Sequence, residues 1–207
     1  MRPILFNTDM VRAILSGSKT VTRRICRDAN KLTVPLSDTI DHNARTYTVE
    51  GINEDGITQY LAERRMPYAA GDILWVRETW AKVAPDIYAY KADNDRQVPR
   101  WHPSIHMPKE AARLFLRVTD VRLERLREIS EEQAQREGIR LQHEDFIPAY
   151  HYRKAELPGD GWKTAGSAFA ALWNSTVRPQ ESGRYGWDAN PWVWVIEFER
   201  MKGKNTR

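Results

Sequence analysis

Strand-length apolar runs recur along this chain with only short helical segments between them, and this pattern limits the folds it can adopt. A doubly wound parallel sheet would need a substantial helix between successive strands, and such helices are missing from the pattern. The chain has 207 residues, enough for one domain with a sizeable core. The sequence therefore predicts a single α+β domain built on a small mixed β-barrel.

The expected strands can be placed by the spacing of their apolar residues. They are residues 3–6, 20–25, 45–49, 73–80, 87–90, 113–126 and 192–199. In the run 113–126 the apolar alternation slips phase, which predicts a β-bulge near Thr119 and Asp120. On the last run four apolar side chains share one face, as in a buried strand: Trp192, Trp194, Ile196 and Phe198.

Four short segments favour helices. The first begins after Asp9, the expected N-cap, and ends before Gly17. Residues 58–65 favour a polar helix. Ser130 starts a capping box whose helix ends at Gly138, and residues 165–173 form an amphipathic helix.

The composition limits the environment and the ligands of the protein. A formal net charge of +4 and an isoelectric point near 9.2 are compatible with a polyanionic ligand. The single cysteine, Cys26, excludes an internal disulfide framework and favours a reducing compartment. No apolar run approaches membrane-spanning length, and residues 1–3 begin no signal peptide. We therefore expect a cytoplasmic protein without a membrane partner.

One polar segment concentrates reactive side chains where a helix gives way to a strand. Residues 17–24 are Gly-Ser-Lys-Thr-Val-Thr-Arg-Arg. A lysine, two threonine hydroxyls and two guanidinium groups in such a short segment are typical of a site that binds an anion or activates a hydroxyl. Core packing does not require this composition. We expect Arg23 and Arg24 to bind the substrate.

This segment resembles the G-x-K-T-x-T-x-R signature of the ASCH domain family, small barrels related to PUA domains. Later segments agree in order: Gly71-Asp72 before a strand, a long strand at 114–121, a helix ending in Glu137-Gly138, and the terminal strand 194–198. Residues 71–80 and 185–192 look like the larger phage and prophage members. The resemblance covers nearly the whole chain. It implies one PUA-like domain over residues 1–200, with short flanking helices, insertions at about 41–63 and 140–163, and a frayed basic tail at 201–207.

The resemblance also implies two kinds of activity. ASCH domains are associated with binding of RNA or modified nucleotides. Small members are amidohydrolases that remove the acetyl group from N4-acetylcytidine with a lysine, a threonine and a glutamate. By motif position these catalytic residues would be Lys19, Thr22 and Glu137. A ribonuclease activity is attributed to one branch of the family.

The chemistry of these three residues can be examined separately from the resemblance. A threonine hydroxyl needs a base within hydrogen-bond reach, and a lysine with a lowered pKa could serve. Arg23 and Arg24 would lower the pKa of Lys19. Glu137 lies at a helix C-terminus, where a raised pKa would suit a proton donor. In an ideal strand Lys19 and Thr22 would point to opposite faces, so the preceding turn must redirect Lys19. The simpler alternative is a solvated helix-end lysine near a threonine that only favours a strand.

Further candidate binding residues lie in two aromatic segments. Glu78 and Trp80 would face inward near a strand end, where they could hydrogen-bond to a base or ribose and stack on the base. A buried ion pair is the alternative for Glu78. The loop that contains Trp101, Ser104 and His106 could close over a flat ligand or only brace the barrel.

No cofactor and no metal site are expected. His102 and His106 are four residues apart, but Pro103 interrupts the helix that would align them. The leading hypothesis is an amidohydrolase acting on an N4-acylated cytidine-like substrate, bound as a nucleoside or within RNA. The alternatives are a non-catalytic module that binds RNA or a modified base, a ribonuclease-like protein of phage origin, and an accessory protein whose ligand is another protein. The sequence does not indicate an oligomeric state.

Overall fold

The computed structural model describes residues 1–28, 40–52, 58–93, 98–144, 147–151 and 161–201. Its strands are β1 Arg2–Leu5, β2 Val21–Ile25, β3 Ile40–Asp41, β4 Thr46–Ile52, β5 Thr58–Arg65, β6 Ile73–Arg77, β7 Trp80–Ala84, β8 Ile87–Tyr90, β9 Phe115–Arg125, β10 Arg140–Glu144, β11 Ile147–His151 and β12 Trp192–Arg200. Its α-helices are α1 Thr8–Leu15, α2 Glu131–Arg136, α3 Ala165–Thr176 and α4 Ser182–Tyr185. Short 3₁₀ helices include η2 Ser104–His106 and η3 Lys109–Ala111.

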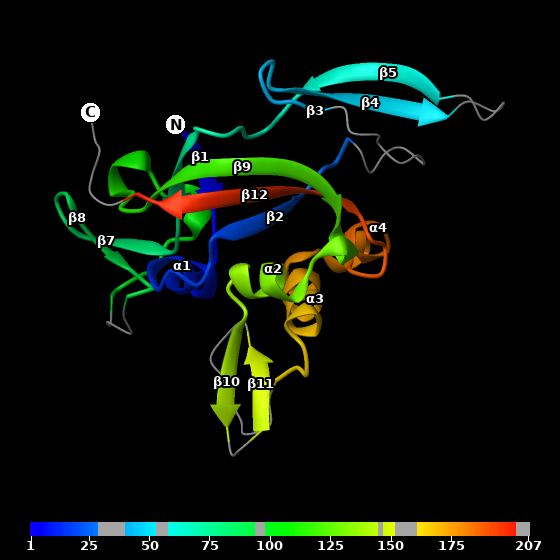
Figure 1. Ribbon diagram of the computed structural model, residues 1–207. Coiled ribbons are helices and arrows are strands. Elements are labelled where there is room, and N and C mark those ends of the chain that lie inside the picture. The colour runs from blue at the N-terminus through cyan, green and yellow to red at the C-terminus, as the bar shows by residue number, and fades with distance from the viewer. Residues whose placement is uncertain (29–39, 53–57, 94–97, 145–146, 152–160, 202–207) are drawn as a thin grey trace.

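A five-stranded mixed sheet with the order β1-β6-β9-β12-β2 forms the centre of the molecule (Figure 1). β1 runs parallel to β6, and the other neighbours are antiparallel. β1 and β2 are therefore the two edges. The α+β class is confirmed, but among the described strands this sheet is open, so the expected closed barrel is not observed.

The two edge strands are nevertheless joined by a side chain. Arg24 on β2 donates a hydrogen bond from Nη2 to the carbonyl oxygen of Leu5 on β1, at 2.7 Å. Its guanidinium also lies over the ring of Phe6, 5.1 Å from the centroid. A side-chain contact thus spans the gap where a main-chain ladder would close a barrel.

Strand β12 lies between β9 and β2, and its two faces pack into different parts of the core. Trp194, Ile196 and Phe198 belong to a cluster that includes residues of β1, α1 and β9, and Tyr47 of β4 packs edge-on against Trp194 at 4.9 Å. The alternate residues, such as Val195, pack in a second cluster with α2 and α3. Figure 1 shows α2 and α3 on one side of the sheet and the β3-β4-β5 sheet on the other.

The register of β12 with β9 shifts between Glu197 and Phe198, which pair with Asp120 and Val118. Thr119 is therefore the additional residue on β9. The bulge expected from the slipped alternation is confirmed.

Two local expectations need correction. The N-cap of α1 is Asn7, whose side chain accepts a hydrogen bond from the amide of Met10 at 2.9 Å, and Asp9 lies inside the first turn. Residues 58–65 form strand β5, which pairs with β4, and do not form a helix. The main-chain ladder to β4 satisfies the polar backbone of this segment, whose local composition favours a helix.

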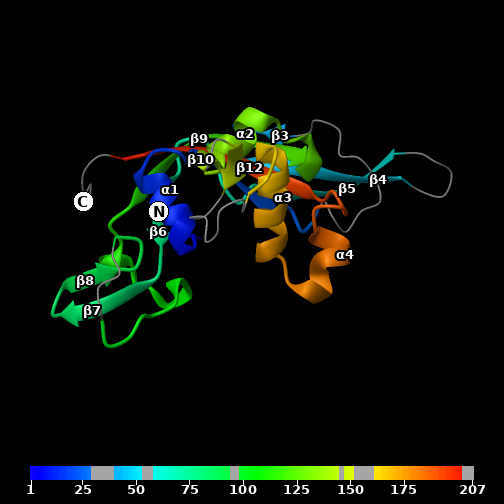
Figure 2. The same cartoon turned by 90° about the horizontal axis from the view of Figure 1, so that it is seen from below.

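The segments expected as insertions lie outside the five-stranded sheet. β3, β4 and β5 form a separate antiparallel sheet, and β10 and β11 form a hairpin. Figure 2 shows that the β7–β8 hairpin and the helices α3 and α4 extend to the same side of the central sheet. The expected basic tail beyond Met201 lies outside the described residues. No helix in the described ranges is long and apolar enough to cross a membrane.

Candidate active site

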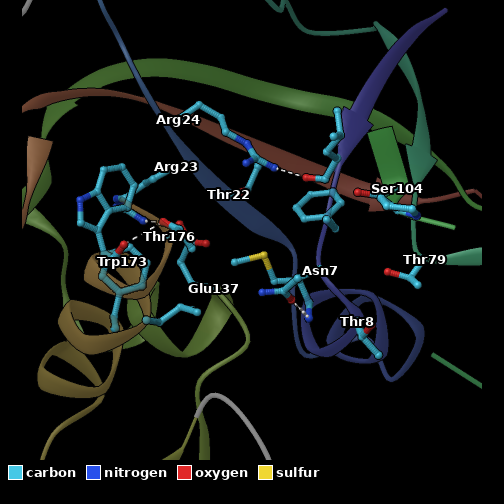
Figure 3. A pocket seen from close by; sticks show the side chains of 16 residues that line it. Asn7, Thr8, Thr22, Arg23, Arg24, Thr79, Ser104, Glu137, Trp173 and Thr176 are labelled. Carbon is cyan, nitrogen blue, oxygen red and sulfur yellow. Dashed lines mark hydrogen bonds and ion pairs between the residues drawn. The ribbon is translucent and has the colours of Figure 1, made fainter. Parts of the chain in front are cut away.

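A cavity of about 370 Å³ lies along the edge strand β2 (Figure 3). Its walls come from β2, from the segment that joins β1 to α1, from η2, and from α3. Small-molecule sites in proteins typically enclose about 300–1,000 Å³. The cavity is therefore large enough for a ligand of nucleoside size.

The position of β2 at the edge explains how residues from both faces of one strand reach the same cavity. Thr22 and Arg24 lie opposite Ile196 and Trp194 on one face, and Arg23 lies on the other face. All three line the cavity. Because none of the described strands pairs with the free edge of β2, a ligand there can be contacted from both faces.

Lys19 and Glu137 form a deeply buried ion pair beside this cavity. Lys19 Nζ lies 2.6 Å from Glu137 Oε2 and donates a second hydrogen bond to the Glu137 carbonyl oxygen at 2.8 Å. Lys19 is 1% exposed and Glu137 is 3% exposed. Of the pair, Glu137 lines the cavity and Lys19 lies behind it. The alternative of a solvated lysine is wrong.

The backbone between α1 and β2 directs the Lys19 side chain towards Glu137. Gly17 has a φ of 80°, a conformation that glycine adopts without strain. The Lys19 amide then donates to the carbonyl of Ala13 at 3.0 Å, and the backbone of Lys19 bridges that of Glu137. Gly138 has a φ of 101°, and a Cβ there would lie 2.9 Å from the Cβ of Ala13. Glycine therefore allows the end of α2 to approach close enough for the ion pair.

Arg23 holds the other oxygen of Glu137. Its Nη1 lies 3.3 Å from Glu137 Oε1, and its Nη2 donates to Gln133 Oε1 at 2.7 Å and to Glu124 Oε2 at 3.2 Å. Gln133 also completes the capping box with Ser130, so the start of α2 is tied to β2. Glu124 and Gln133 were not expected from the sequence, and they orient Arg23.

Burial changes the proton affinity of Lys19. Loss of hydration lowers the pKa of Lys19 below its usual value, although the Glu137 carboxylate opposes this effect. Arg24 and Arg23 lower the pKa further, as expected from the sequence. A lysine with a lowered pKa can act as a base closer to neutral pH.

Thr22 lines the cavity and has no hydrogen-bond partner for its side chain among the described residues. The residue is buried and lines the cavity, and no hydrogen bond joins its hydroxyl to another described residue, Lys19 included. Lys19 is therefore bonded to Glu137 and not to Thr22. Thr22 is related to this pair only because Thr22 and Glu137 line the same cavity. The hydroxyl remains free to contact a ligand.

Glu78 forms the buried ion pair that was the alternative to a binding role. Arg113 contacts both carboxylate oxygens, with Nε at 2.9 Å from Oε1 and Nη2 at 3.0 Å from Oε2, and also bonds to Asp93. Burial raises the pKa of Glu78, although Arg113 opposes the shift. Glu78 does not line the cavity, whereas the adjacent Thr79 does.

We predict that Arg113→Met lowers the free energy of unfolding by about 3–5 kcal/mol, because Glu78 then remains buried without a counter-charge. The loss should shrink at acid pH. A raised pKa means that the folded state binds the proton of Glu78 more tightly, so protonation stabilises the fold as the pH falls through that pKa. Urea titrations at two pH values measure both effects.

Arg117→Met is the matched control for this prediction, since the ion pair of Arg117 with Glu199 is exposed. It should change the free energy of unfolding by less than about 0.5 kcal/mol. If Arg113→Met and Arg117→Met lowered the free energy of unfolding equally, the Glu78–Arg113 pair would have no special structural role.

The remaining candidates divide between the cavity and its surroundings. Ser104 lines the cavity from η2. Trp80 is buried, and its ring centroid lies 5.7 Å from that of Tyr88 and 5.0 Å from that of His102. These neighbouring rings occupy the surface on which a ligand base would stack. Trp101 is half-buried and His106 is exposed, and neither lines the cavity. Within the described ranges, no group of three or more His, Cys, Asp or Glu side chains is placed to hold a metal ion.

The sequence did not identify the aromatic wall of the cavity. Phe169 and Trp173 on α3 line it, and the Arg23 guanidinium lies 5.8 Å from the centroid of Phe169. Their spacing of four residues on an amphipathic helix indicated only core packing. Asn7 and Thr8 at the start of α1 line the opposite side, as Figure 3 shows.

Comparisons of the chain with family models, curated proteins and solved structures gave no match. The assignment of a function therefore depends on the geometry of the cavity and on the resemblance of residues 17–24 to the ASCH signature.

Proposed function

We propose that the protein is an ASCH-type amidohydrolase that removes the acyl group from an N4-acylated cytidine-like base. The five-stranded sheet, bridged by Arg24 at its edges, would be the core of a PUA-like barrel. The buried contact of Lys19 with Glu137, beside a cavity that Glu137 and Thr22 both line, is the observation that carries the proposal.

In the proposed reaction the Thr22 hydroxyl attacks the carbonyl carbon of the amide. The new C–O bond forms while the hydroxyl proton passes to the Lys19–Glu137 pair, with the neutral Lys19 amine as its acceptor. As the C–N bond breaks, this pair returns the proton to the departing N4 amine through Glu137. Water then hydrolyses the threonine ester, releases the carboxylic acid and restores the hydroxyl.

Arg24 is suited to stabilise the negative charge that develops on the carbonyl oxygen. It lines the cavity, donates one hydrogen bond to Leu5, and forms no ion pair with a carboxylate in the described part of the chain. Its remaining N–H groups can therefore be offered to a ligand. A preorganised donor at such a position contributes about 10²–10³-fold to turnover.

The direct test is incubation of the protein with N4-acetylcytidine, followed by chromatography of cytidine and acetate. The proposal predicts both products in equal amounts. Arg117→Met is a suitable control, because Arg117 is exposed and does not line the cavity. Absence of product from every N4-acylated cytidine tested, together with tight binding of RNA, would favour the non-catalytic module, in which Phe169 and Trp173 would stack on a base.

We predict that kcat/KM rises with pH through the pKa of Lys19, because only the neutral amine can accept a proton. This pKa lies below the usual lysine value. Glu137→Gln removes the carboxylate that raises the pKa of Lys19, so the rise should move to lower pH while the maximal rate falls. The measurement is kcat/KM as a function of pH for both proteins. An identical pH profile in the variant would argue against Lys19 as the base.

A further inference from the structure

A second, smaller cavity lies at the other end of β1, and arginines dominate its lining. It has a volume of about 120 Å³ and is formed by the first residue of β1, the turn before β4, the end of β5 and the segment before β6. Among the described residues, Arg2, Arg45 and Arg65 contribute three guanidinium groups to the lining, and Asp72 contributes the single carboxylate.

The three guanidinium groups differ in their hydrogen bonds and ion pairs. Arg45 forms an ion pair with Asp72 at 2.7 Å, and Arg2 donates to the carbonyl oxygen of Pro67. No hydrogen bond or ion pair engages the side chain of Arg65 within the described ranges. In the part of the lining that the structure describes, one carboxylate thus faces three cations, which gives an excess of positive charge. Arginine is particularly suited to bind phosphate oxygens, because its fixed N–H groups match their geometry.

The two cavities lie at opposite ends of β1. Arg2 begins β1 and lines the second cavity, whereas Leu5 ends β1 and lines the first. Three residues of a strand span about 10 Å. A ligand that extends beyond one nucleoside could therefore reach both cavities.

We propose that the cavity formed by Arg2, Arg45 and Arg65 binds a phosphate group of the substrate whose base occupies the first cavity. This inference depends on the proposed function for the identity of the base and not for the binding of phosphate. The phosphate could belong to the nucleotide itself or to a neighbouring phosphodiester of an RNA strand. The test below distinguishes these two sources.

Arg65→Ala and Arg64→Ala form a matched pair for the experiment. Arg64 and Arg65 are consecutive residues of β5, and they pair with Tyr47 and Thr46 of β4, respectively. Their side chains therefore leave β5 on opposite faces. Arg64 is also exposed but does not line the cavity. Both substitutions remove one exposed positive charge, and only one of them alters the cavity.

The probes are N4-acetylcytidine, its 5′-monophosphate, and a short single-stranded RNA that contains the same base, with affinities measured by titration at several salt concentrations. We expect Arg65→Ala to bind a phosphate-bearing probe several-fold more weakly and Arg64→Ala to match the wild type. If the RNA phosphodiester is the ligand, the slope of log affinity against log salt for RNA should fall by about 0.7–1. If Arg65→Ala weakens binding of the monophosphate, the site binds the nucleotide's own phosphate. If it weakens binding of RNA alone, the site binds a phosphodiester.

Equal binding of both phosphate-bearing probes by the two variants would overturn the proposal. So would failure of the wild-type protein to bind either probe more tightly than the nucleoside. Turnover is read separately. A protein that binds RNA through Arg65 without deacylating any probe would disprove the proposed reaction and retain the phosphate site. Deacylation of the nucleoside together with equal binding of both phosphate-bearing probes by the two variants would disprove the phosphate site and retain the reaction.

Discussion

Replacing Thr22 with valine is expected to lower kcat/KM for N4-acetylcytidine by roughly 10³-fold or more, because the proposed nucleophile is lost. The fold should tolerate the change. No described residue hydrogen-bonds to the Thr22 hydroxyl, so the substitution leaves no partner unsatisfied, and the branched shape that packs beside β12 is retained. Deacylation assays together with thermal unfolding would measure both quantities.

Thr22→Ser is the informative control, since it keeps a hydroxyl and removes a methyl group. It should retain activity to within about tenfold of the wild type. The proposed nucleophile would be wrong if valine and serine gave the same rates, or if the valine variant kept most of its activity. In that case Glu137 could activate water directly, because it also lines the cavity.

Replacing Lys19 with methionine should affect both turnover and stability. Loss of the base should reduce kcat by about 10²–10⁴-fold. The Glu137 carboxylate would lose its contact at 2.6 Å while remaining buried, and Arg23 would still contact its other oxygen. The free energy of unfolding should therefore fall by less than the roughly 3–5 kcal/mol that a fully unpaired buried charge costs. Steady-state kinetics and urea unfolding on the same preparation would measure the two effects.

The double substitution Lys19→Met with Glu137→Met separates these effects. Removing both charges leaves no unpaired carboxylate, and replacement of a buried pair by apolar residues is often neutral for stability. Arg23 would keep its contacts with Gln133 and Glu124. Stability should therefore recover while activity stays low. Recovery of activity together with stability would mean that the pair has only a structural role.

The parts of the fold that could be predicted from the sequence are those specified locally. The capping box at Ser130 and the glycine at position 138 define α2 through contacts within a few residues. The slipped alternation around Thr119 similarly identified the bulge. Residues 58–65 were mispredicted, because the pairing that makes them a strand is provided by β4 and not by their own composition.

The candidate site was predictable only in part for the same reason. The resemblance to the ASCH signature singled out Lys19 and Thr22, and the resemblance of the later helix end singled out Glu137. The structure joins Lys19 to Glu137 and places Thr22 and Glu137 on one cavity. The contact of Glu78 with Arg113 joins segments without a common motif. Only the folded arrangement reveals such partners.

The pairing of β2 with β12 also has a consequence for the order in which the protein can fold during synthesis. β2 follows the first helix, yet its only strand neighbour in the central sheet is the last strand described. A nascent chain on the ribosome can form α1 and the β7–β8 hairpin early, but Thr22 lacks its neighbouring strand until β12 has emerged. Contacts between segments so far apart form slowly. The pocket should therefore be among the last parts of the molecule to assemble, and a prematurely terminated chain should be unable to bind its ligand.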